Sequence, residues 1–98
     1  MVSLIAGTTG SVTGILKDTS GMPVSGGKVT LVDLARGKSV VTTADRKGSW
    51  VFPVVLPGTY KLHAEAKGFA PQDHPPVAIH VDSMLKIDLT LEAEKAPQ

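Results

Sequence analysis

The sequence predicts an all-β protein, a seven-stranded antiparallel β-sandwich. Three observations carry this prediction. Apolar and polar residues alternate with period two in several short segments, turns rich in Gly and Pro separate these segments, and no stretch shows the 3.6-residue period of an amphipathic helix. A chain of 98 residues predicts one domain, which can bury a core without a metal or disulfide bonds.

The first three strands are expected between residues 10 and 44. Residues 10–17 form the first, and a connection dense in turn-forming residues follows it, under which the apolar Val24 is expected to pack. Residues 27–34 form the second strand. Arg36-Gly37 marks a hairpin turn, and residues 39–44 return as the third strand.

The fourth strand follows a clear turn signal. In Asp45-Arg46-Lys47-Gly48, the Asp is expected to bond nearby backbone groups and the Gly to close the turn with a positive φ. Residues 49–52 form the strand, which places Trp50 and Phe52 on one face. Pro53 lacks an N–H, so it ends the strand or confines it to a sheet edge.

The fifth strand, residues 59–67, alternates an apolar face with a polar one, as a half-buried antiparallel strand does. Large apolar and aromatic side chains on the inward faces of the fourth and fifth strands are expected to anchor the core. These anchors are Trp50, Phe52, Tyr60 and Leu62.

The end of the chain predicts a last hairpin. Residues 68–76 are an irregular, proline-rich crossing in which Phe69 is expected to plug one end of the core. Residues 77–81 and 85–92 then form the two arms of the hairpin, and the second arm has the cleanest period-two alternation in the sequence. The expected division is 1–9 as a flexible N-terminal segment, 10–92 as the β-sandwich domain and 93–98 as a tail or linker.

Composition excludes several classes of function. The net charge is +1 with scattered basic residues, which argues against nucleic acid as a partner. There is no cysteine, so disulfides and thiolate zinc sites are excluded. No apolar run reaches the length of a membrane span, and residues 1–6 are too short and uncharged for a complete signal peptide.

No metal, cofactor or catalytic site is expected. His63, His74 and His80 show no ligand spacing and are interpreted as scattered surface residues. The turn at residues 45–48 has two basic central residues, which argues against calcium. No nucleophile motif such as GxSxG occurs, and we therefore predict that the chain is not an enzyme.

One surface feature suggests docking. A turn at Arg36-Gly37 would pair Val32 with Val41 and, by alternation from the inward-facing Leu31, would place Val32, Leu34 and Val41 together on the outer face. One explanation is β-propensity alone, since Val suits any strand. The other is a small docking patch for an adjacent domain or a second copy.

Five ordered motifs resemble a known family. They are Gly10-x-Val12, Asp18-x-x-Gly21-x-Pro23-Val24-x-Gly26, Thr43-x-Asp45-x-x-Gly48-x-Trp50-x-Phe52, Leu56-Pro57-Gly58-x-Tyr60 and Gly68-Phe69. Over residues 10–91 the chain resembles the carboxypeptidase regulatory-like domains, which implies a transthyretin-like (prealbumin-like) topology and a non-catalytic module. Such modules accompany metallocarboxypeptidases, begin TonB-dependent outer-membrane receptors, or repeat along bacterial surface proteins.

The related Cna B-type adhesin domains carry an internal isopeptide bond, which needs a buried Lys and a buried Glu. At the matching positions this chain has Leu16 and Ala64. Lys17 and Glu65 are each one residue away, which turns them to the other face of their strands. The resemblance therefore implies a domain without the bond.

The resulting expectation is an exported accessory module, in the periplasm, the outer membrane or at the cell surface, that docks on or spaces a larger protein. Its partner would be a neighbouring domain or another protein, and the isolated domain would be a monomer or a weak dimer. The alternative is a carbohydrate- or ligand-binding module of the same fold. That alternative needs exposed aromatic rings, whereas Trp50 and Tyr60 are interpreted as core residues.

Overall fold

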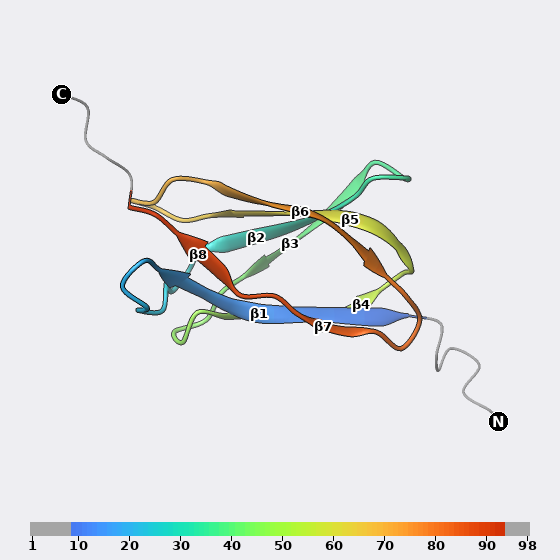
Figure 1. The fold of residues 1–98 in the computed structure, drawn as a ribbon, viewed down its shortest axis with the longest axis horizontal. Helices are drawn as coiled ribbons and strands as arrows, with labels where there is room; N and C mark the ends of the chain where they lie inside the picture. The colour runs from blue at the N-terminus through green and yellow to red at the C-terminus, as the bar shows by residue number, and fades with distance from the viewer. Residues whose placement is uncertain (1–8, 94–98) are drawn as a thin grey trace.

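The computed structural model describes residues 9–93, and the predicted all-β sandwich is confirmed (Figure 1). Two sheets pack face to face. One has the order β4-β1-β7 with β8 also paired to β1, and the other has the order β3-β2-β5-β6. The strands are β1 (Gly10–Asp18), β2 (Lys28–Asp33), β3 (Lys38–Thr43), β4 (Ser49–Val55), β5 (Gly58–Glu65), β6 (Gln72–Ile79), β7 (Met84–Lys86) and β8 (Leu89–Leu91).

The described chain has eight strands rather than seven, because the last predicted strand is interrupted. β7 and β8 both lie beside β1 and keep one register, since Ser11 is opposite Met84 and Leu16 is opposite Leu89. Between them the Ile87 N–H donates to the carbonyl of Thr13. Both pairings are parallel, so this sheet is mixed and not purely antiparallel.

The predicted last hairpin is wrong. β6 pairs with β5 in one sheet, whereas β7 and β8 pair with β1 in the other, so the connection at residues 80–83 crosses between the two layers. Asp82 turns the chain there with a φ of 61°. β6 also begins at Gln72, inside the stretch predicted to be irregular. It accommodates Pro75 and Pro76 because it is an edge strand.

The turn before β4 forms as predicted. The Asp45 carboxylate accepts the N–H groups of Lys47 and Ser49, and Gly48 has a φ of 76°. β4 continues through Pro53 to Val55, again at a sheet edge. This turn fixes the start of β4 and therefore the inward direction of its aromatic side chains.

The core lies between the two sheets. All four predicted anchors are buried there, as is Val24, and Phe69 packs partly buried against the same cluster. The fully buried side chains that surround them come from both sheets and include Val12, Leu16, Val29, Leu31, Ile79 and Leu91. No helix long and apolar enough to cross a membrane occurs among residues 9–93.

Candidate functional site

The β2–β3 hairpin, which carries the predicted docking patch, has a different register from the one expected. Asp33 is opposite Lys38 and Val32 is opposite Ser39, so each pair is shifted by two residues. The predicted pairing of Val32 with Val41 is therefore wrong. The turn comprises residues 34–37 and is centred on Ala35-Arg36 rather than on Arg36-Gly37.

A shift of two residues keeps every side chain on its face. Val32 and Val41 thus remain on the outer face as diagonal neighbours, with Thr30 directly opposite Val41. Val32 is half-buried, and 56% of Val41 is exposed. Leu34 follows the end of β2 and is 48% exposed. The three side chains are apolar and in contact with solvent.

Asp33 holds the turn in this position. Its side chain is only 8% exposed, and its Oδ1 accepts the N–H groups of Ala35 and Arg36. Its Oδ2 accepts from the Arg36 guanidinium at 2.6 Å, and its carbonyl accepts the Gly37 N–H. The hydrogen bond from Arg36 lowers the pKa of Asp33. The sequence analysis missed this residue, although an Asp four residues before a Gly is a turn signal.

We expect acid to destabilise the fold partly through this carboxylate. The pKa of Asp33 is lowered from its ordinary value of 3.8 in the folded state, so the unfolded chain binds more protons below that pH. The stabilisation is complete above pH 3.8 and is lost as pH falls through the lowered pKa. Urea unfolding at pH 7, 4 and 3 should therefore show a declining midpoint.

The variant Asp33→Asn should show a smaller decline of the urea midpoint with falling pH. Its amide oxygen can still accept the N–H groups of Ala35 and Arg36, but the amide does not titrate. Lys47→Gln, which alters an exposed turn residue, serves as the control. An acid dependence in Asp33→Asn as steep as that of the unaltered protein would contradict the role of Asp33.

A groove of about 360 Å³ runs beside β3, where the edges of the two sheets face each other. Lys38 and Val40 line it from β3, and Val54 lines it from β4. Asp33 and Arg36 supply charged groups to its wall. The lining is otherwise mainly apolar, and no exposed aromatic ring offers a platform for a sugar, since Phe52 and Tyr60 in the wall are buried.

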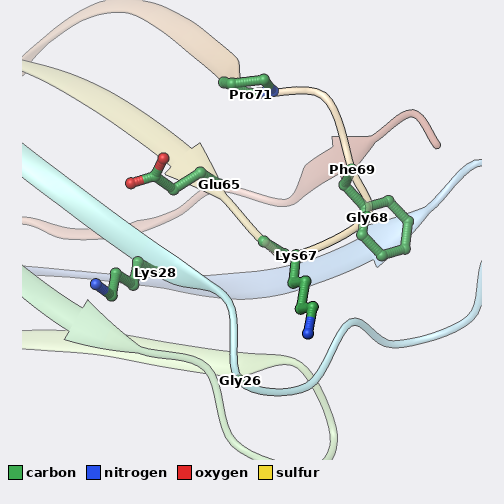
Figure 2. Close-up of a pocket in the computed structure, with 8 residues that line it drawn as sticks. Gly26, Lys28, Glu65, Lys67, Gly68, Phe69 and Pro71 are labelled. Carbon is green, nitrogen blue, oxygen red and sulfur yellow. The ribbon is translucent and has the colours of Figure 1, made fainter. Parts of the chain in front are cut away.

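A second hollow, of about 630 Å³, lies at the other end of the β2–β5 pair from this groove, where β2 begins and β5 ends (Figure 2). Lys28 and Glu65 stand opposite each other on these strands, and the loop with Lys67 and Phe69 closes one side. Figure 2 shows the charged side chains spread around the rim rather than converging. Such an open, polar hollow offers no converging set of groups to one ligand.

The two isopeptide positions lie in the core. Leu16 and Ala64 are both completely buried and apolar. Lys17 is half-buried and Glu65 is exposed, each beside the inward-facing residue. The bond needs a buried amine beside a buried carboxyl, and the two core positions hold neither group.

We therefore predict that the chain forms no internal isopeptide bond. Intact-mass spectrometry should return the mass calculated from the sequence. As a control, the same measurement after trypsin digestion should give only linear peptides. A deficit of one water or one ammonia would contradict the prediction, because bond formation releases one of them.

Each of the three histidines has different surroundings. His63 Nδ1 is 2.6 Å from Asp73 Oδ1 across β5 and β6, and His74 Nδ1 is 2.8 Å from the carbonyl of Pro75. His74 lies in β6 rather than in a loop, and His80 is exposed. Within residues 9–93, no three side chains of His, Cys, Asp or Glu are grouped to hold a metal ion.

A comparison with protein families matches residues 11–92 to the carboxypeptidase regulatory-like domain. No curated protein matches the chain. The solved structures that share its fold include three with low sequence identity to this chain. Hydroxyquinol 1,2-dioxygenase from Pseudomonas putida DLL-E4 aligns with a TM-score of 0.74 and 10% identity, over 93% of this chain and 58% of its own.

The second is GBS52, the minor pilin of Streptococcus agalactiae, with a TM-score of 0.71 and 13% identity, over 93% of this chain and 47% of the pilin. The third is a candidate carbohydrate-binding protein from Bacteroides uniformis ATCC 8492, with a TM-score of 0.66 and 18% identity, over 84% and 40% of the two chains. The chain thus spans about half the length of these structures, and the similarity is one of fold.

Proposed function

The chain belongs to the carboxypeptidase regulatory-like domain family, and from that premise we propose that it is a structural module of a larger exported protein. The family domain is non-catalytic. The module docks on a neighbouring domain, or on another protein, through the outer face of β2 and β3. In this role it spaces or stabilises its parent protein and carries out no chemistry.

The observation that carries the proposal is the patch of Val32, Leu34 and Val41. The outer face of an antiparallel sheet normally meets water with polar residues. Here Leu34 and Val41 are about half exposed, and Val32 lies beside them. Covering these side chains removes apolar area from water, which favours association at roughly 25 cal/mol per Å² of area buried before association costs.

Export of the parent protein is supported by analogy. One structure with the same fold is a minor pilin of a Gram-positive pathogen. The family resemblance further implies a place at the start of TonB-dependent receptors or in strings on bacterial surface proteins. We propose an N-terminal receptor domain or a surface-protein repeat as the context. Sequencing the surrounding gene tests this, since a β-barrel pattern or tandem copies would support it and a cytoplasmic enzyme domain would oppose it.

The docking role is tested by the double variant Val32→Lys and Val41→Glu in the full-length protein. We expect association with the neighbouring domain to weaken at least tenfold, because two charges would have to be desolvated in the contact. The matched control is Val51→Glu with Val54→Lys, which makes the same changes at exposed valines of β4. Equal association of both variants and the unaltered protein would contradict the docking role.

A second candidate is ligand binding in the groove beside β3. Its apolar lining and its volume of about 360 Å³ favour a small apolar ligand rather than a sugar. Trp50 emission titrated with a soluble oligosaccharide should therefore stay constant, because the ring is buried in the core. Quenching of that emission would instead support carbohydrate binding.

A further inference from the structure

β3 differs from the other edge strands of the described sandwich. A sheet edge exposes unpaired N–H and C=O groups, and proteins usually protect it with prolines, bulges or short strands. β4 contains Pro53, β6 contains Pro75 and Pro76, and β7 and β8 have only three residues each. β3 has six residues, Lys38–Thr43, with neither a proline nor a bulge in its pairing with β2.

The hydrogen-bond pattern shows which groups of β3 are free. The Ala44 N–H donates to Gly27, the residue opposite it, so Ala44 faces β2. Backbone groups alternate in direction along an antiparallel strand. Ser39, Val41 and Thr43 therefore direct their N–H and C=O groups away from β2, toward the open edge.

We propose that a second copy of this chain pairs with β3 through its own β3, antiparallel, about a two-fold axis at Val41. In this register Val41 is opposite Val41 of the second copy, and Ser39 is opposite Thr43. It is the register in which all three outward-facing residues of the strand find outward-facing partners. Each of these pairs can exchange two backbone hydrogen bonds.

The side chains suit the same register. Two valines meet at the centre of the outer face, and Ser39 and Thr43 are small polar partners on either side. Lys38 lies opposite Ala44 of the second copy, one residue from Asp45. The one cation of the strand thus has an alanine opposite it and no like charge.

The contact is small. Two edge strands of six residues bury less than the roughly 1,200 Å² typical of stable interfaces, so the isolated domain associates weakly. Copies held together in one assembly would pair at a much higher effective concentration. This contact uses the backbone edge of β3, whereas the proposed docking role uses the outer face of β2 and β3. Val41 takes part in both, and Val32 belongs to the docking patch alone, so a change at Val32 distinguishes the two roles.

Single cysteines test the register without interference, because the chain has no native cysteine. Val41→Cys should form a disulfide-linked dimer under mild oxidation at least tenfold faster than Lys61→Cys, which is exposed on β5. Opposite residues in such a pair have Cα atoms about 5.5 Å apart, within disulfide range. Ser39→Cys and Thr43→Cys should cross-link slowly alone and faster when mixed.

Adding Ser39→Pro to Val41→Cys should reduce the cross-linking rate at least tenfold, because it removes an outward N–H and no bond to β2. Ser39→Ala is the control, and thermal melting checks that each variant folds. Adding Val32→Lys should change the rate less than threefold, which separates this contact from the docking patch. Cross-linking of Val41→Cys no faster than that of Lys61→Cys would overturn the proposal, even if Ser39→Pro did not fold.

Discussion

Trp50→Ala is expected to lower the free energy of unfolding by about 3–5 kcal/mol, as large-to-small changes of buried aromatic residues do. The Trp50 side chain is 2% exposed, and its ring meets that of Phe52 edge-on with centroids 5.9 Å apart. Removing it leaves a cavity that a rigid β-sandwich fills poorly. Urea unfolding monitored by circular dichroism measures the loss.

Val51→Ala is the matched control, because Val51 is the next residue of β4 and points to solvent. It should change stability by less than about 1 kcal/mol. Trp50→Phe should cost less than half as much as Trp50→Ala, since it also removes a buried indole N–H that has no partner in the described residues. A water-like emission maximum of native Trp50 would contradict its burial.

Gly14→Ala is expected to destabilise the fold by about 3 kcal/mol or more, toward the upper end of overpacking effects. A Cβ at Gly14 would overlap the carbonyl oxygen of Ile87 and would lie 2.6 Å from Cζ2 of Trp50. The carbonyl oxygen of Ile87 is a backbone atom, so a change of side-chain rotamer cannot relieve this overlap. Thermal unfolding of the variant measures the effect.

The double variant Gly14→Ala with Trp50→Phe distinguishes the two obstacles. It should show no rescue relative to the sum of the single changes, because the oxygen of Ile87 remains in place. Ser11→Ala on the same strand is the control and should be nearly neutral. A loss below about 1 kcal/mol for Gly14→Ala would contradict the close approach of β1 to the segment between β7 and β8.

Local chemistry made parts of the fold predictable from the sequence. The alternation of residues 59–67 predicts the inward face of β5, since Tyr60, Leu62 and Ala64 are all buried. The Asp45 turn is also predictable, because an Asp side chain and a Gly with positive φ suffice to define it. Both features depend only on residues close together in the chain.

The remaining features depend on contacts between distant segments. The unbroken alternation of residues 85–92 does not reveal the interruption at Ile87, where the backbone lies against Gly14 of β1. Alternation also does not identify the strand with which a given strand pairs. The prediction of a hairpin between two successive segments is therefore wrong, since β6 pairs with β5 and β7 pairs with β1. In the candidate site, the side chain of Asp33 set a register two residues from the one counted on the Arg36-Gly37 turn.

The parallel pairing of β1 with β8 has a mechanical consequence. β1 begins at Gly10 and β8 ends at Leu91, and because the strands are parallel these points lie at opposite ends of the sheet (Figure 1). A tensile force applied along the chain would pull the two strands past each other in shear. The ladder bonds would then bear the load together rather than open one by one as in a zipper, which suits a link that must transmit tension.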